Sequence, residues 1–401
     1  MLVHDQLSDL RNCAVSTMQL RITYKCNGNC SFCEQPSWSK EKRTQDMSKD
    51  LLYKYLAPLY SNICYLSLLG GEPTVSKETL PYCKFISETY PHITLGMYTN
   101  GIAFNQEWAE FAADNLMRVR ISLNAASPET YHNGVWRDHS NVFERVDANI
   151  KRYVSILKLR GLECFSPGIS MVVTEQTACD VYDFVKYALV NDLSACTFHF
   201  DASGRDNTTR TKNAAILELM KLERVLAGKF FLLFRMYIHT SVQEVMQQLV
   251  EKIPLEALNE EYSDILTLAT HRSMQNEFLD RQKIRRTKGK RELTFDEDWT
   301  PFFRYTECTG KKTCGSAFSN LEIYPDGRYD ICCFINPRFK LDFEKEVDWK
   351  GEYNRIELEA YRKNMLSGQY DYCLPSCPVN LSCVEPNISH KYGFYRANGD
   401  L

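Results

Sequence analysis

The chain has 401 residues, 44% of them hydrophobic, so it is long enough to form two or three domains with cores of their own. A formal net charge of -3 gives no reason to expect a polyanionic partner, and we predict that the protein does not bind nucleic acid. No apolar run approaches the ~20 residues that span a bilayer, and the N-terminus lacks a signal-peptide pattern, so we expect a cytoplasmic protein without a membrane partner.

The first predicted domain covers residues 15–205, where short apolar strands alternate with amphipathic helices. The predicted strands are 18–25, 63–69, 93–99, 117–123, 168–174 and 195–200. Three helices are predicted between them. The first is capped by Ser48 and runs to Leu59, the second covers 139–160 and the third covers 178–190. This pattern is typical of a parallel α/β sheet closed into a full or partial barrel. Ligands of such sheets bind beyond the carboxyl ends of the strands, so the residues there are candidate site residues.

The end of the first strand carries a C-x3-C-x2-C cluster, Cys26, Cys30 and Cys33, in a loop loosened by Gly28. Three thiolates so close in sequence can face one centre. Fe–S clusters normally take four cysteines, so a loop with three leaves one iron open to an outside ligand. Zinc is an alternative, but catalytic zinc sites usually include His or a carboxylate, and neither is close in sequence.

This spacing, with the aromatic Phe32 just before the third cysteine, resembles the signature of the radical S-adenosylmethionine (SAM) superfamily. After the second strand, Gly70-Gly71-Glu72-Pro73 is similar to the family's GGEP motif, which holds the amino group of SAM. The resemblance implies a partial (β/α)6 TIM-like barrel and a [4Fe-4S] cluster on the three cysteines, with SAM bound at the open iron.

The ends of the third and fourth predicted strands carry further residues that resemble the family's motifs. Thr99-Asn100-Gly101 is similar to the family's TNG turn, and Ser122 and Asn124 stand where the family places residues that face the SAM ribose and carboxylate. The implied cofactor-binding residues are Phe32, Gly70, Gly71, Glu72, Pro73, Asn100, Ser122 and Asn124. His199, on the sixth strand, is either a proton carrier near the substrate or a core histidine, and no catalytic residue is assigned.

The resemblance does not cover residues 206–302, which contain no cysteine and read as mostly helical, with amphipathic stretches over 216–226 and 242–250. This segment is longer than a connection between compact domains needs, so it covers the active site or docks a partner. The run of basic residues from Arg281 to Arg291 either holds a phosphate or an acidic leader peptide, or forms a solvated loop.

Residues 303–401 form a second cysteine-rich region. Two short strands joined by Pro325-Asp326-Gly327 predict a β-hairpin that brings Cys314 and Cys332 near each other. A helix over 356–366, closed by Gly368, follows. The spacing resembles the SPASM or shorter twitch extension of radical SAM enzymes, which binds auxiliary [4Fe-4S] clusters. The first assignment is one auxiliary cluster, held by Cys314, Cys332, Cys373 and Cys377.

Two departures from that pattern leave alternatives open. No cysteine follows Cys383, and Cys373-x3-Cys377 is one residue wider than the usual spacing. The rival assignment therefore has two auxiliary clusters, one on Cys308, Cys314 and Cys332 and the other on Cys373, Cys377 and Cys383. A zinc knuckle is a further alternative. Cys333 is left as a thiol that either donates a hydrogen atom or is a buried bystander.

The sixteen cysteines fit this reading, because cytoplasmic thiols stay reduced and favour metal sites over disulfides. The remaining cysteines of the first domain are scattered among apolar residues, and we predict that they are buried small side chains. They are Cys13, Cys64, Cys83, Cys164, Cys179 and Cys196.

The resemblance implies that one electron from the reduced cluster splits SAM into methionine and a 5′-deoxyadenosyl radical, which removes a hydrogen atom from the substrate. We predict an oxidoreductase that dehydrogenates or epimerises a small molecule such as a sugar, aminocyclitol or nucleoside, with flavodoxin or ferredoxin as reductant. Few residues precede Cys26, whereas peptide-modifying relatives often carry a leader-recognition domain there. Two alternatives stay open, namely modification of a ribosomal peptide by crosslinking or epimerisation, and a non-catalytic Fe–S protein for electron transfer or sensing.

Overall fold

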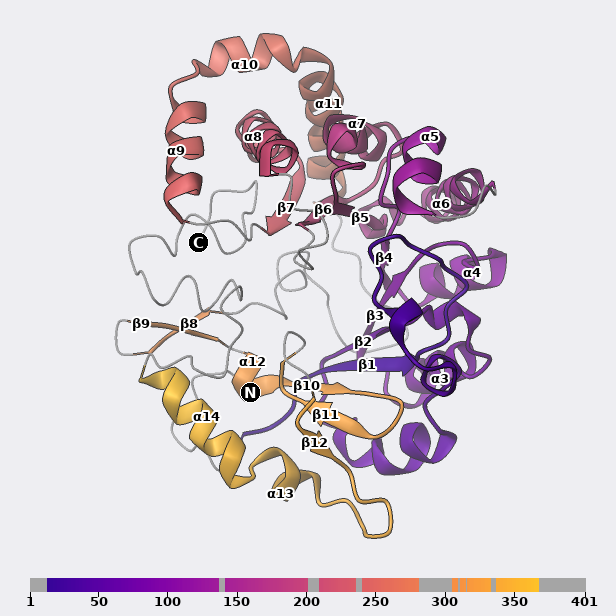
Figure 1. The fold of residues 1–401 in the computed structure, drawn as a ribbon. Coiled ribbons are helices and arrows are strands. Elements are labelled where there is room, and N and C mark those ends of the chain that lie inside the picture. Colours follow the sequence, from indigo (N-terminus) through magenta and orange to yellow (C-terminus); the bar gives the residue numbers. More distant parts are fainter. Residues whose placement is uncertain are drawn as a thin grey trace. The chain divides into compact units, whose positions relative to one another are not determined.

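The computed structural model describes residues 13–136, 141–200, 209–235, 240–280, 305–308, 311–314, 316–332 and 337–367 (Figure 1). The chain divides into two compact units. Unit 1 comprises Met1–Cys26, Trp38–Tyr98 and Lys283–His390, and unit 2 comprises Asn27–Ser37, Thr99–Gln282 and Lys391–Leu401. The boundary between the units therefore falls inside the cysteine loop, between Cys26 and Asn27.

Unit 1 contains three parallel strands, β1 (Thr17–Thr23), β2 (Tyr65–Gly70) and β3 (Thr94–Thr99). On the other edge of β1 lies β10 (Asn320–Ile323), also parallel, followed by the antiparallel strands β11 (Arg328–Asp330) and β12 (Phe339–Lys340). Their order is β12-β11-β10-β1-β2-β3. Every residue of β1 except Arg21 is buried, and the apolar Met18, Leu20 and Ile22 alternate with polar residues along the strand.

The helices of unit 1 are short. They are α2 (Lys40–Arg43), η2 (Leu51–Tyr55), η3 (Ala57–Leu59), η4 (Pro73–Val75), α3 (Thr79–Thr89), α12 (Ser316–Ser319), α13 (Trp349–Tyr353) and α14 (Ile356–Leu366). A separate antiparallel pair, β8 (Tyr305–Cys308) and β9 (Lys311–Cys314), completes its described elements. Arg362 of α14 is fully buried, and its Nε donates to the Ala317 carbonyl at 2.8 Å, which ties α14 to α12.

Unit 2 holds four strands, β4 (Arg118–Ile121), β5 (Gly168–Val173), β6 (Ala195–Phe200) and β7 (Phe231–Arg235), each pair of neighbours parallel. Its helices are η1 (Gln35–Ser37), α4 (Gln106–Asp114), α5 (Pro128–Thr130), η5 (Tyr131–Val135), α6 (Val142–Leu159), η6 (Glu163–Phe165), η7 (Ala178–Asp180), α7 (Val181–Val190), α8 (Thr209–Leu226), α9 (Thr240–Glu251), α10 (Leu255–Glu261) and α11 (Ser263–Asp280). The last three follow one another around α8 (Figure 1).

The predicted fold class is confirmed, because the structure is a mostly parallel α/β fold in which each of the six predicted strands is present within one or two residues of its expected ends. Two features differ from the sequence prediction. The helix expected from Ser48 to Leu59 is two short turns, η2 and η3, because Pro58 cannot continue a helix and restricts the residue before it. The segment 206–302 also contains a strand, β7, which pairs with β6.

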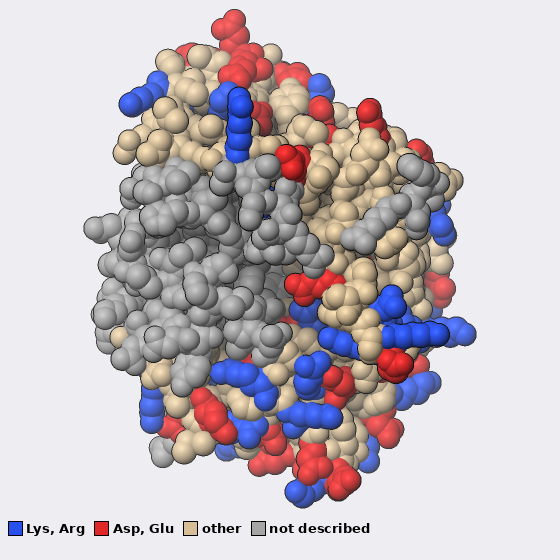
Figure 2. All heavy atoms as spheres, viewed as in Figure 1, with Lys and Arg blue, Asp and Glu red and all other residues tan. Residues whose placement is uncertain are grey.

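Basic and acidic side chains lie next to each other over the described residues in the lower half of Figure 2, in keeping with the small net charge. Among the residues that the structure describes, no helix has both the length and the hydropathy that a bilayer span requires.

Candidate cluster and cofactor site

The segment from Cys30 to Cys33 forms a tight turn in unit 2. The backbone N–H of Cys33 donates to the carbonyl of Cys30 at 3.2 Å, so the two cysteines stand at the two ends of one turn. Both side chains are half-buried, as is Phe32 between them. The backbone N–H of Gln35 donates to Sγ of Cys33 at 3.4 Å.

This turn is anchored on the segment that ends η5. Ser31 donates its backbone N–H to the carbonyl of Val135 at 2.9 Å and its hydroxyl to the carbonyl of Gly134 at 2.6 Å. Cys30 and Trp136 form an isolated antiparallel bridge. Burial raises the pKa of Tyr131 above its usual range, and a negative charge on Cys30 raises it further. No sequence motif pointed to these anchors, because they lie about a hundred residues from the cysteines.

Cys26 ends the part of the loop that belongs to unit 1, and it is exposed. Just before it, the carbonyl of Thr23 accepts from the N–H of Gly71, and the carbonyl of Lys25 accepts from the N–H of Glu72, both at 2.7 Å. The Gly-Gly pair is required by this approach. A Cβ on Gly70 would lie 2.2 Å from the Thr23 carbonyl oxygen, and one on Gly71 would lie 2.1 Å from that of Lys25.

Glu72, the predicted ligand of the SAM amino group, is 1% exposed. Its Oε1 accepts from the backbone N–H of Thr74 at 3.0 Å and from the Thr74 hydroxyl at 2.6 Å. Glu72 therefore caps η4, and Pro73 occupies the first position of that turn, where its missing N–H costs nothing. The cap fixes the direction of the Glu72 carboxylate.

The turn after β3 reaches the cysteine loop within unit 2. The amide nitrogen of Asn100 donates to Oδ1 of Asn27 at 2.8 Å, and its oxygen accepts from the N–H of Ile102 at 3.0 Å. Gly101 has φ of +78°, a conformation that favours glycine. Asn100 is thus placed next to the residue that follows Cys26 in the chain.

Ser122 and Asn124 come together at the end of β4, in unit 2. Asn124 has φ of +64° and is buried, with its Oδ1 accepting from the N–H of Val172 at 2.9 Å and its amide donating to the Ser122 carbonyl at 3.0 Å. The Ser170 hydroxyl contacts that of Ser122 at 3.4 Å. These bonds fix the end of β4 on β5, and the role of both residues toward SAM stays a prediction.

Sequence reasoning missed Asp180, which supports the loop that follows Asn124. Its carboxylate accepts from the N–H of Ala126 and from the Thr130 hydroxyl, both at 2.8 Å, and the side chain is buried. The available signal was an acidic residue at the start of a predicted helix, which by itself indicates only a helix cap.

The structure describes the second cysteine region in part. The predicted hairpin is confirmed, as β10 and β11 pair antiparallel, and half-buried Cys332 follows β11. Cys308 and Cys314 end the paired strands β8 and β9. Other predictions lie outside the described residues, namely those on Cys333, Cys373, Cys377, Cys383, Gly368 and the basic run 281–291. His199 lies on β6, opposite Val172 and Arg235, and is half-buried.

The scattered cysteines follow the prediction only in part. Cys13, Cys83 and Cys196 are buried, and burial raises the pKa of the Cys83 thiol well above its usual range. The prediction was wrong for Cys64 and Cys179, which are exposed because one precedes β2 and the other lies in the turn η7 before α7. The Cys164 side chain lies outside the described residues.

The donor set fits an iron–sulfur cluster. Cys26, Cys30 and Cys33 are reduced thiols that are exposed or half-buried, and two of them are preorganised by a turn. Among the residues with described placement, no three His, Cys, Asp or Glu side chains are already arranged as a metal site.

Residues 20–188 match the Radical SAM superfamily. GTP 3',8-cyclase of Paenarthrobacter nicotinovorans is 26% identical over 117 residues, which are 28% of this chain and 33% of that protein. The FeMo cofactor biosynthesis protein NifB of Methanocaldococcus jannaschii is 23% identical over 207 residues, which are 46% of this chain and 69% of that protein. The matches to the first GTP 3',8-cyclases span a third to a half of their length, from 33% to 50%.

Among solved structures, Streptococcus suis SuiB is similar in fold, with a TM-score of 0.54 at 15% identity, over 98% of this chain and 78% of that one. SuiB bound to S-adenosylmethionine gives a TM-score of 0.51 at 15% identity, over 90% of this chain and 69% of that one. These likenesses agree with the mostly parallel α/β fold and the partial barrel expected from the sequence. Residues 20–188 of the chain are thus a radical SAM domain, in agreement with the cysteine turn and the Gly-Gly contact.

Proposed function

We propose that this protein cleaves SAM reductively and uses the resulting 5′-deoxyadenosyl radical to abstract a hydrogen atom from a small molecule. The observation that carries the proposal is the contact between the GGEP segment and the residues just before Cys26. Glu72 donates its backbone N–H to the carbonyl of Lys25, the residue before Cys26, and this contact supports the proposal that Glu72 binds SAM beside the cluster loop.

Cys26, Cys30 and Cys33 would hold the SAM-binding [4Fe-4S] cluster, and the N–H of Gln35 would stabilise the Cys33 sulfur as a thiolate ligand. When bound, the cluster supplies the electron that splits the sulfonium bond of SAM. Glu72 would accept a hydrogen bond from the SAM amino group, since its carboxylate is buried and already oriented by Thr74. Asn100, Ser122 and Asn124 would contact the remaining polar groups of SAM.

We further propose a net oxidation or epimerisation, for which the second cysteine region is the support. Cys314, Cys332, Cys373 and Cys377 would hold one auxiliary [4Fe-4S] cluster, which orients the substrate or takes up the second electron. A flavodoxin or ferredoxin would act as reductant. The cytoplasm, where thiols stay reduced, is the expected compartment.

Small molecules are the first substrate class, in line with the curated relatives named GTP 3',8-cyclase. A ribosomal peptide is the second candidate, favoured by one observation. The fold likeness to SuiB extends over nearly the whole chain, and SuiB bound to its precursor peptide SuiA gives a TM-score of 0.50 over 99% of this chain.

The test is anaerobic incubation of the iron-loaded protein with SAM and dithionite, followed by measurement of 5′-deoxyadenosine. We expect its formation without added substrate at a slow rate. A protein with a fully loaded N-terminal cluster that forms none would overturn the proposal and favour an Fe–S protein for electron transfer or sensing. Deuterium transfer into 5′-deoxyadenosine from labelled candidate sugars or from a labelled peptide then separates the two substrate classes.

A further inference from the structure

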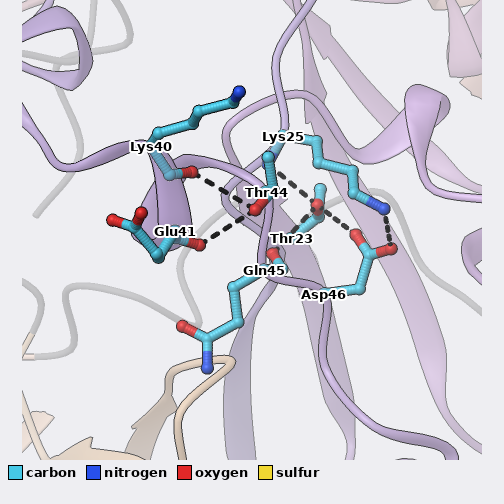
Figure 3. A network of polar contacts seen from close by, with 7 residues as sticks. All are labelled: Thr23, Lys25, Lys40, Glu41, Thr44, Gln45 and Asp46. Atoms are coloured by element: carbon cyan, nitrogen blue, oxygen red, sulfur yellow. Dashed lines mark hydrogen bonds and ion pairs between the residues drawn. The ribbon is translucent and has the colours of Figure 1, made fainter.

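The base of the cysteine loop is closed by a short antiparallel pairing inside unit 1. Thr23 and Asp46 form a bridge, the N–H of Tyr24 donates to the carbonyl of Gln45, and the N–H of Met47 donates to the carbonyl of Ile22, the last two at 2.9 Å. The segment that follows the loop thus returns to the residues just before Cys26, as Figure 3 shows for Thr23, Lys25 and Asp46.

Asp46 joins this pairing through both oxygens of its side chain. Oδ1 accepts from the Thr23 hydroxyl at 2.5 Å, and Oδ2 pairs with the ammonium of Lys25 at 2.5 Å. The Thr23 hydroxyl oxygen in turn accepts from the backbone N–H of Lys25 at 3.0 Å. The Lys25 and Asp46 side chains are 43% and 31% exposed, so their ion pair contributes little to global stability. Its effect is local, on Lys25, the residue directly before Cys26.

The segment that presents Asp46 is itself fixed. The hydroxyl of Thr44 donates to the carbonyls of Lys40 and Glu41, at 3.2 and 3.0 Å, at the end of α2 (Figure 3). The ammonium of Lys42 lies 3.7 Å from the centroid of the Trp38 ring. Gln45 and Asp46 therefore follow a hydrogen-bonded turn directly.

The opposite side of the same backbone carries Gly71 and Glu72, so Thr23 and Lys25 are held from two sides. We infer that Asp46 is a positioning residue, which fixes the backbone of residues 23–25 and thereby the place of Cys26 relative to Glu72. The inference rests on the proposed function, because it assigns Cys26 to the cluster and Glu72 to SAM. Asp46 touches neither group and acts through Thr23 and Lys25.

The test compares D46A, D46N and T23V with wild type in the iron-loaded protein. D114A is the matched control, because Asp114 forms an exposed ion pair with Arg160 at 2.7 Å. The readouts are iron content, melting temperature, and the SAM concentration needed to change the EPR signal of the reduced cluster. We expect D46A to require about tenfold more SAM, because small misplacements of a site weaken its geometry strongly. D46N, whose amide oxygen still accepts from Thr23, and T23V, which keeps the Lys25 pair, fall between D46A and wild type.

Wild-type SAM dependence in D46A would overturn the inference, as would a D46A protein that differs only in melting temperature, which would mark a merely structural role. If D46A does not load a cluster, D46N and T23V decide by the same titration. A wild-type protein whose loaded cluster does not respond to SAM would instead reject the proposed function. D114A should match wild type in every readout.

Discussion

The two cysteine-rich regions of the chain differ in how far apart their ligands lie in sequence. Near the N-terminus, Cys30 and Cys33 are the two ends of one backbone-bonded turn, and Cys26 lies shortly after β1, which ends at Thr23. In the C-terminal region, Cys314 ends β9 and Cys332 follows β11, so any shared centre requires two separate pairs of strands to be placed first.

The two regions place different demands on the folding of the protein. A turn of four residues is specified locally, so the backbone that carries Cys30 and Cys33 is set before metal arrives. Ligands on separate elements depend on tertiary packing, and metal binding there is coupled to folding. The N-terminal centre should therefore tolerate damage to the C-terminal one, while the C-terminal centre depends on the whole of its region.

The largest effect is expected at the turn itself. Cys30→Ala should abolish 5′-deoxyadenosine formation and lower iron by about four atoms per chain, since one ligand of a [4Fe-4S] cluster is lost. The measurement is iron analysis together with the SAM cleavage assay. Cys64→Ala, at an exposed cysteine outside both regions, is the control. Cleavage that survives in the Cys30 variant would remove the cluster assignment.

The next largest effect is expected at the backbone contact between Gly71 and the residues just before Cys26. Gly71→Ala places a Cβ 2.1 Å from the Lys25 carbonyl oxygen, so the two backbone segments must move apart. We expect the free energy of unfolding to fall by about 3 kcal/mol, which is a typical cost of overpacking. Gly161→Ala is the matched control, because a Cβ there meets nothing within 4 Å and only its φ of +65° is unfavourable. Equal melting temperatures for the two variants would contradict this account.

A smaller effect tests the independence of the two regions. Cys332→Ala should lower iron from about eight atoms per chain to about four and spare part of the SAM cleavage, because two [4Fe-4S] centres become one. Full iron in this variant would show that Cys332 is not a ligand. Loss of all SAM cleavage would contradict this prediction, because it would show that the N-terminal centre depends on the C-terminal one.

The smallest effect lies on α8, outside both regions. Burial raises the pKa of the half-buried Glu223 carboxyl to about 8. A carboxyl whose pKa is higher in the folded state adds stability below its unfolded value, and this stability is lost as pH rises toward about 8. The melting temperature of Glu223→Gln should therefore equal that of wild type in mild acid and exceed it in mild alkali. The exposed Glu256→Gln is the control, and parallel profiles for wild type and Glu223→Gln would contradict the prediction.

Local patterns in the sequence predicted what depends on neighbouring residues. The strands of the barrel, the Ser48 cap, which accepts from the N–H of Leu51 at 3.1 Å, and the hairpin at Pro325-Asp326-Gly327 are each fixed by a few adjacent side chains. The candidate site residues at the strand ends were predicted from the family resemblance, and the rule that parallel strands place their carboxyl ends at one edge agrees with it.

What the sequence did not predict depends on distant partners. Strand β7 lies in a stretch with strong helical periodicity on both sides, and its pairing with β6 is what makes it a strand. Asp46 and Asp180 are ordinary acidic residues until Thr23 or Ala126 comes within hydrogen-bonding distance. Without those contacts, composition gives no reason to single them out.

The parallel pairing of β10 with β1 also bears on how the chain is made. One edge of the first strand finds its partner some three hundred residues later, Thr17 opposite Asn320. During synthesis that edge stays uncovered until most of the polypeptide has left the ribosome, and a bare strand edge is a template for unwanted association. Nascent or truncated chains that end before β10 should therefore depend on chaperones.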